Sequence, residues 1–250
     1  MDPIVHNSPM DHINSFLGRL HENDPQTTKV HLVEEPGRSS LPPWLDVNEL
    51  LVKIGNALRN NTTVTKLVIG HLPQAIQDKG VCALYNLLLH NTTIRDVVIQ
   101  NVRFEGLLGL RHIFSGIARN PNSALRNLTV ASAEFLEYEE ETDEMHTDPT
   151  AVFYHDAEAL AELLRNTTTL RKINLSPNGI HDVIATQLLA PALAANTSVT
   201  EMNVTLNDDL TADGLYALRM AMGSRGTVIM DCIDEEIARA RNVVHTIPLE

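Results

Sequence analysis

Two hydrophobic periods alternate along most of the chain. Residues 157–165 place apolar side chains at the spacing of one helical face and are mainly strong helix formers. Residues 170–175 follow a polar turn, and their apolar side chains alternate as in a strand with one buried face. The pattern therefore predicts a unit made of a helix, a polar turn and a short strand.

This unit recurs six times in phase. The first apolar residues of the expected strands are separated by 30, 31, 45, 29 and 29 positions, and they are Val64, Ile94, Leu125, Leu170, Val199 and Val228. The strand and turn at 170–180 have the spacing L-x-x-I-x-L-x-x-N-x-I, which is typical of a leucine-rich repeat. One such unit cannot bury its apolar face alone, so neighbouring units should stack.

The expected fold is an α/β leucine-rich-repeat solenoid, a short horseshoe with a parallel concave sheet and helices on the convex side. We expect about six repeats plus caps. One inward position of each strand should form an apolar ladder through Leu67, Val97, Leu128, Ile173 and Met202.

Both ends of such an array need a cover. We assign residues 1–45 to an N-terminal tail and a degenerate capping repeat with an expected strand at 29–33. Residues 46–231 hold the repeats, with an insertion at 133–150 that accounts for the longest spacing. Residues 232–250 should form a C-terminal capping helix and tail.

Polar turns follow most of the expected helices, and many contain Asn-x-Thr or Asn-x-Ser. Because no secretory signal is apparent, we interpret them as turn residues and not as glycosylation sites; their asparagines are Asn61, Asn91, Asn127, Asn166 and Asn196. A second asparagine follows the strand at Asn178 and Asn207. Leu72 and Val102 replace it in the first two regular units, where less regular loops are expected.

The repeated theme A-L-A-x-x-L-x-x-N-T-x-L-x-x-L-x-L, over roughly residues 50–230, resembles the ribonuclease-inhibitor type of leucine-rich repeat. Its N-T-x-L turns are similar to those of the C-terminal repeat domain of the tropomodulin family. The first resemblance implies a protein-interaction module. The second implies a cytoskeletal regulator at actin pointed ends, although this chain has no evident N-terminal actin- or tropomyosin-binding helical region. A third alternative is a GTPase-activating protein, since some repeat proteins of this class act on small GTPases, but no arginine finger can be placed.

Composition narrows the class of partner. The formal net charge of −13 and the pI near 5.2 argue against a nucleic-acid-binding surface. The chain shows no long apolar run, no signal peptide and no cysteine motif. We therefore expect a cytoplasmic monomer that binds a protein partner and neither nucleic acid nor membrane.

Five polar residues near the strand starts are the candidate partner-binding site on the concave face: Arg95, Arg126, Arg171, Lys172 and Asn174. Like charges on strands about 5 Å apart repel, so an anionic partner or an internal carboxylate would relieve them. The alternative is that they are ordinary solvated arginines.

The insertion carries the second candidate, an acidic and aromatic loop formed by Glu137, Tyr138, Glu139, Glu140, Glu141, Asp143 and Glu144. Three interpretations remain open: a solvated loop, a recognition loop for a basic partner, and a cover over the arginines.

Nothing in the sequence indicates catalysis. The chain contains no nucleophile elbow, no phosphate-binding glycine loop and no metal-ligand spacing, so we expect a non-catalytic protein without cofactor or metal. Cys82 lies among Val81, Ala83 and Leu84, and we expect it in the core.

Overall fold

The computed structural model describes residues 9–33, 45–106, 108–136 and 149–230. The described helices are α1 (Pro9–His21), α2 (Val47–Leu58), α3 (Asp78–His90), α4 (Gly109–Ala118), α5 (Pro149–Asn166), the π-helix η1 (Ile184–Leu189), α6 (Ala190–Ala195), α7 (Ala212–Met222) and the 3-10 turn η2 (Gly223–Arg225). The described strands are β1 (Lys29–Val33), β2 (Lys66–Gly70), β3 (Ile76–Gln77), β4 (Asp96–Glu105), β5 (Asn127–Leu136), β6 (Lys172–Asn174), β7 (Glu201–Asn203) and β8 (Thr227–Ile229).

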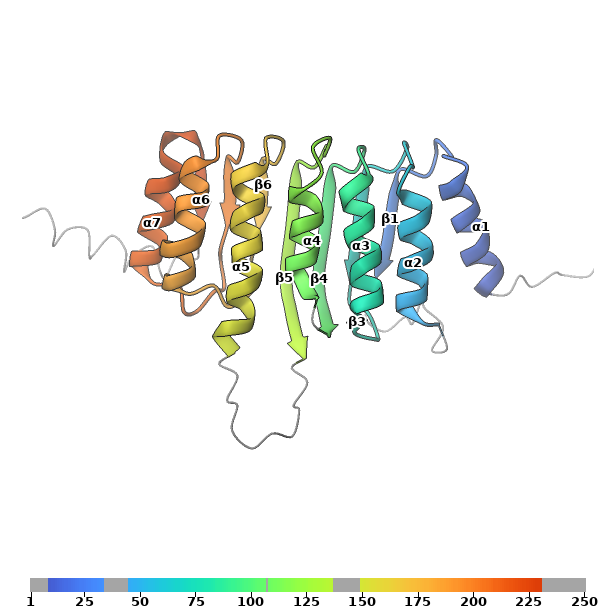
Figure 1. Cartoon of the computed structure of the whole chain (residues 1–250), viewed down its shortest axis with the longest axis horizontal. Helices are drawn as coiled ribbons and strands as arrows, with labels where there is room; N and C mark the ends of the chain where they lie inside the picture. The colour runs from blue at the N-terminus through green and yellow to red at the C-terminus, as the bar shows by residue number, and fades with distance from the viewer. Residues whose placement is uncertain (1–8, 34–44, 107, 137–148, 231–250) are drawn as a thin grey trace, which may run out of the picture.

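These eight strands form one parallel sheet. Seven of them follow one another in chain order, β1-β2-β4-β5-β6-β7-β8, and the short β3 pairs with the far end of β4. Figure 1 shows the helices in the same order on one side of the sheet, and no described helix covers the other side, called the open face below. This is a leucine-rich-repeat-like α/β arrangement, as the alternating periods predicted.

The core lies between the sheet and the helices. Leu67, Val97, Leu128, Ile173 and Met202 are paired strand by strand in a single register and are almost fully buried, which confirms the predicted ladder. Their neighbours on each strand point to the open face, as the two-residue period of a strand requires.

Helix α3 shows how the helical faces are chosen, and it corrects one expectation. Val81, Leu84, Leu87 and Leu88 lie on one side and are buried against the sheet. Cys82 follows Val81 by about 100° around the helix axis and is exposed, so the expectation of a core cysteine was wrong.

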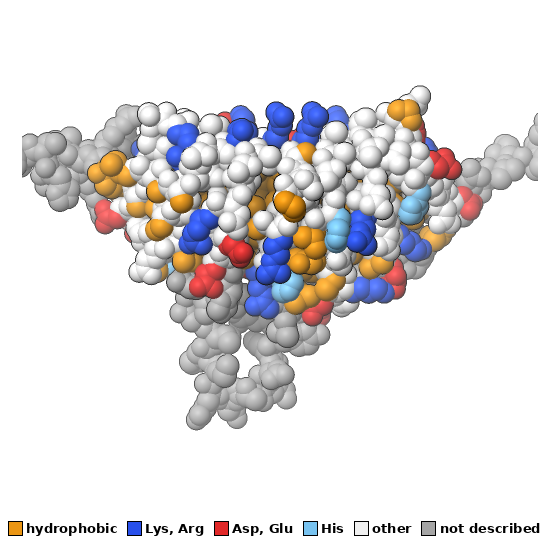
Figure 2. All heavy atoms as spheres, turned by 45° about the horizontal axis from the view of Figure 1, so that its top comes forward, with side chains coloured by type: hydrophobic (Ala, Val, Ile, Leu, Met, Phe, Trp, Pro, Cys, Tyr) orange, Lys and Arg blue, Asp and Glu red, His pale blue; other side chains and the backbone are white. Residues whose placement is uncertain are grey.

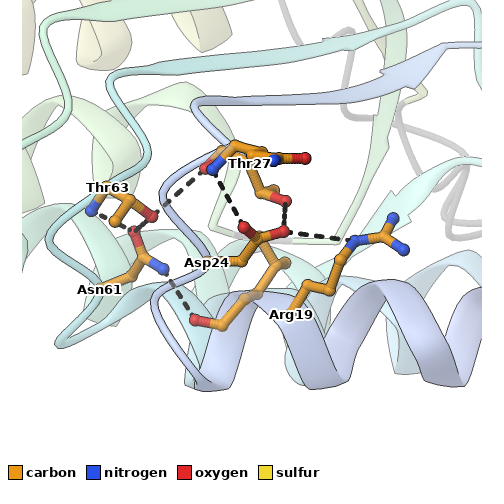
Figure 3. Close-up of polar contacts among 7 residues, drawn as sticks. Arg19, Asp24, Thr27, Asn61 and Thr63 are labelled. Carbon is orange, nitrogen blue, oxygen red and sulfur yellow. Dashed lines mark hydrogen bonds and ion pairs between the residues drawn. The ribbon is translucent and has the colours of Figure 1, made fainter.

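The first unit is complete and is joined to the second by polar contacts (Figure 3). Strand β1 pairs with β2, as the alternation at 29–33 predicted. Asn61 donates its Nδ2 hydrogen to the carbonyl of Leu20 at 2.7 Å, and the Thr63 hydroxyl donates to the carbonyl of Thr27 at 3.2 Å. Within the turn of the first unit, between α1 and β1, Asp24 accepts hydrogen bonds from the amide of Gln26 and the hydroxyl of Thr27.

Less regular loops were expected at Leu72 and Val102; residues 71–75 after β2 are indeed irregular, whereas β4 continues through Val102. His71, Asn101 and Ser132 occupy successive registers and all have φ near +50°. After this single left-handed residue, β4 continues to Glu105 and β5 to Leu136, and Val102 is buried in the extension. In β4 and β5, a single left-handed residue within the continuing strand therefore replaces the asparagine turn.

The insertion is partly built into these elements, since β5 extends to Leu136 and α5 begins at Pro149. The acidic loop residues themselves, and the expected C-terminal capping helix within 232–250, lie outside the described residues.

Candidate functional site: the basic edge of the sheet

Buried asparagines hold the turns that connect the helices to the strands. The Asn91 Nδ2 atom donates to the carbonyl of Leu58 at 2.7 Å, at the end of the preceding helix. Its Oδ1 atom accepts from the amides of Thr93 and Ile94 at 2.8 Å. Asn61 and Asn196 make the same two kinds of bond in their own turns, and all three are at least 95% buried. Each side chain thus donates to a carbonyl at the end of a neighbouring helix while its oxygen holds its own turn.

The two remaining Asn-x-Thr matches behave differently. Asn166 ends α5 and is exposed, and Thr167 takes over its position by accepting the amide of Leu170 at 3.2 Å. Asn127 is the first residue of β5 and not a turn residue. The interpretation as turn asparagines is therefore confirmed for Asn61, Asn91 and Asn196 only.

This scaffold brings the three predicted arginines together at the edge of the sheet. The amide of Arg126 donates to the carbonyl of Arg95, and the amide of Arg171 to the carbonyl of Arg126, both at 2.8 Å. Each arginine comes one residue before its strand begins. They therefore lie at the amino-terminal edge of the sheet, whereas Lys172 and Asn174 lie on β6 itself and face the open side.

The three guanidinium groups are not equivalent. The Nη1 atom of Arg171 donates to the carbonyls of Thr168 and Ser198, at 3.2 and 2.9 Å. The side chains of Arg95 and Arg126 are exposed and have no hydrogen bond or ion pair within the described part of the chain. Arg95 and Arg126 thus keep all their side-chain donors available.

Two of the charged residues beside them, Lys172 and Asp96, already have polar partners. Lys172 forms an ion pair with Glu201 at 2.7 Å on the neighbouring strand. Asp96 accepts a short hydrogen bond from the amide group of Asn127. Asn174 is half-buried and turns its Oδ1 atom back to the amide of Ser176 at 3.1 Å. Of the five predicted partner-binding residues, Arg95 and Arg126 are the two whose side chains are free of polar contacts within the described ranges.

A wider surface surrounds this pair. We define the basic edge as the four helix-to-strand turns at residues 59–66, 90–96, 119–127 and 165–172. The only carboxylate in these described segments is Asp96, against eight cationic residues, which are Arg59, Lys66, Arg95, Arg119, Arg126, Arg165, Arg171 and Lys172. Figure 2 shows lysine and arginine side chains in a row along the upper margin of the molecule.

The opposite edge, where the strands end and the helices begin, has more carboxylates than cations, since Lys79, Arg103 and Arg111 are its described lysine and arginine residues. Its described carboxylates are Asp46, Glu49, Asp78, Glu105, Asp156, Glu158, Asp182, Asp208, Asp209 and Asp213. All helices run in the same direction, so their positive dipole ends meet at this edge and favour carboxylates there. The described ends of the acidic insertion, Leu136 and Pro149, also lie at this edge, about 30 Å along β5 from Arg126.

Sequence reasoning missed this separation of charge because the net value of −13 averages over both edges. A signal for it was present. In stacked parallel units, residues at corresponding positions of the repeat lie at the same edge of the sheet. Summing the charges over corresponding positions of the units, and not over the whole chain, would therefore have shown the basic edge.

The helix side carries a groove of about 710 Å³ between α3, α4 and α5. Its lining includes Cys82, Tyr85, Arg111, His112, Arg119 and Glu162, and the rings of Tyr85 and His112 meet edge to face at 6.2 Å. Among the described residues, no group of three or more histidine, cysteine or acidic side chains is arranged to hold a metal ion. Likewise, the described helices include none that is both long and apolar enough to span a membrane.

No protein-family model matches this chain, and no curated protein matches it. Among solved structures, it is similar to one described as leiomodin-1 actin-binding site 2, with 16% identity, a TM-score of 0.46, and 96% of each chain covered. It is also similar to the tropomodulin C-terminal domain of Caenorhabditis elegans, with 12% identity and a TM-score of 0.41, over 93% of this chain and 98% of that one.

Proposed function

We propose that this chain is a non-catalytic protein-binding module that contacts its partner through the basic edge and the adjoining open face. The observation that carries the proposal is the pair Arg95 and Arg126, which are adjacent, exposed and without polar partners in the described residues. The open face beside the pair offers half-buried amide and hydroxyl groups at Thr129, Asn174 and Asn203.

Binding energy at a protein interface comes mainly from a few anchors, and arginine is among the residues enriched there. The anchors here sit on a parallel sheet whose turns are held by buried asparagines, so little backbone ordering is needed when a partner arrives. We include in this proposal that the protein is cytoplasmic and monomeric and that its repeats are of the ribonuclease-inhibitor type.

The test is affinity purification with mass spectrometry, comparing wild type with Arg95→Glu/Arg126→Glu. Arg171 is left intact because it ties two turns together through backbone carbonyls. Lys53→Glu/Arg103→Glu is the matched control, since it makes the same change in charge at exposed residues away from the basic edge. We expect a partner that wild type and control retain and the arginine variant loses. A partner set identical for all three proteins contradicts the proposal.

Actin is a defined candidate partner, because the N-T-x-L turns resemble those of the tropomodulin family. The same three proteins can be tested by co-sedimentation with actin filaments and in a pointed-end assembly assay. Loss of binding in the arginine variant alone would assign actin to the basic edge, and no binding by wild type would remove it. A panel of small GTPases would likewise remove the GTPase-activating alternative if hydrolysis is not accelerated.

A further inference from the structure

We infer that the partner presents a short, extended acidic segment that lies across the helix-to-strand turns and places carboxylates on Arg95 and Arg126. This inference rests on the proposed function and names the chemistry that the basic edge recognises.

The spacing of the two arginines suits such a segment. Their backbones are joined directly between adjacent strands, so they lie about 4.8 Å apart. In an extended peptide, alternate side chains point the same way and are spaced about 6.8 Å apart. Two flexible arginine side chains readily adjust to that difference, and guanidinium groups bind carboxylates through two parallel hydrogen bonds.

The neighbouring cations lengthen the site in both directions. Lys66 flanks Arg95 on β2, and Lys172, which also pairs with Glu201, follows Arg171 on β6. From β2 to β6 the sheet is four strands wide, which corresponds to about 15 Å, or roughly five residues of extended chain. Arg171 orients its guanidinium toward carbonyls of the turns, so Arg95 and Arg126 are the central anchors.

The ends of the basic edge favour a short segment over a long polyanion. The turn before β1 carries Glu22 and Asp24, and β7 on the other side begins with Glu201. A nucleic acid extending past the four central turns would place phosphates beside these carboxylates. The acidic opposite edge and the net charge of −13 would oppose it further. A protein segment with a few acidic residues avoids this repulsion.

The experiment uses fluorescence anisotropy of the full chain with three probes. These are a labelled peptide of about eight residues with glutamate at alternate positions, the same peptide with glutamine, and a single-stranded DNA of similar charge. We expect the glutamate peptide to bind in a salt-sensitive way, with affinity at least about tenfold higher than that of the glutamine peptide. Arg95→Glu/Arg126→Glu should lose at least about tenfold in affinity, while Lys53→Glu/Arg103→Glu should stay within about twofold.

Circular dichroism of each variant confirms that its helices and strands remain. Equal binding of the glutamate peptide to both variants, no binding to wild type, or tighter binding of the DNA would each overturn the inference. The proposed function fails separately. If wild type captures a partner that the arginine variant loses, the proposal of a protein-binding module stands even when the acidic peptide does not bind.

Discussion

The backbone amide of Arg126 donates to the carbonyl of Arg95 at 2.8 Å, which fixes two positively charged side chains one strand apart. The parallel sheet imposes this closeness, and no described carboxylate pairs with either guanidinium. Asp96, the nearest acidic residue in sequence, is engaged by Asn127. The arrangement keeps like charges together on a protein with an excess of acidic residues, so these two arginines do not stabilise each other.

Replacing one of these arginines should therefore cost no stability. We expect Arg126→Gln to leave the free energy of unfolding unchanged or to raise it by up to about 1 kcal/mol at low salt, because it removes a repulsion between adjacent strands. Arg171→Gln should instead lower it by about 1 kcal/mol, since two carbonyl bonds are lost. Urea denaturation at two salt concentrations measures the free energy of unfolding of both variants. A larger loss of stability for Arg126→Gln than for Arg171→Gln would contradict the different roles given to the two side chains.

Two asparagines in identical Asn-Thr-Thr sequences should differ sharply on truncation. Asn91→Ala leaves the amides of Thr93 and Ile94 without partners and removes one of the two hydrogen bonds to the carbonyl of Leu58, so we expect a loss of about 2–3 kcal/mol. Asn166→Ala removes an exposed side chain and should stay within about 0.5 kcal/mol. Thermal and chemical unfolding of the two variants gives the comparison, and equal effects would refute the distinct roles of the two turns.

The first turn should make stability depend on pH. The amide of Gln26 and the hydroxyl of Thr27 donate to Asp24 and hold the pKa of its carboxyl below the ordinary value of 3.8, with Arg19 adding a smaller attraction. A lowered folded pKa means that this stabilisation is fully present above the unfolded pKa and is lost as the pH falls through the folded pKa.

Asp24→Asn should therefore be less stable than wild type near pH 7, and the difference should disappear as the pH falls through the lowered pKa of Asp24 in the folded protein. Glu22→Gln, at an exposed neighbouring position, is the control and should show no such trend. Melting temperatures across this pH range measure it. A difference between Asp24→Asn and wild type that persists unchanged at low pH would show that the carboxylate charge is not its cause.

Two glycines should respond in opposite directions to alanine. A Cβ atom at Gly226 would collide with the backbone of Thr200, which receives the last strand pairing, so Gly226→Ala should destabilise the β7–β8 edge by several kcal/mol. Gly18 lies in α1 with open space around its Cα, and Gly18→Ala should stabilise by about 0.5–1 kcal/mol through helix propensity. Hydrogen exchange at β7 and α1 locates each effect, and a Gly226→Ala protein with unchanged protection at β7 would exclude the predicted collision.

The sequence by itself determined the repeating unit, its phase and its inward ladder. These follow from apolar residues such as Leu128 and Ile173, which must be buried whatever surrounds them. Whether a side chain is buried follows from its residue type and from the spacing of apolar residues along the chain, so burial can be predicted from the sequence. The strand at 29–33 and the helical segments were predictable for the same reason.

Only the tertiary structure decided which polar residues share an edge. Asn91 and Asn166 both begin an Asn-Thr-Thr sequence, yet Asn91 is buried and donates to the carbonyl of Leu58 at a helix end, whereas Asn166 is exposed. Arg95 and Arg126 are 31 positions apart in sequence, and strand pairing makes them neighbours while Arg171 is tied to the turns. Polar groups satisfy donors and acceptors in any available place, including solvent, so their partners depend on geometry that periodicity does not encode. The basic edge exists because parallel units align corresponding turns side by side.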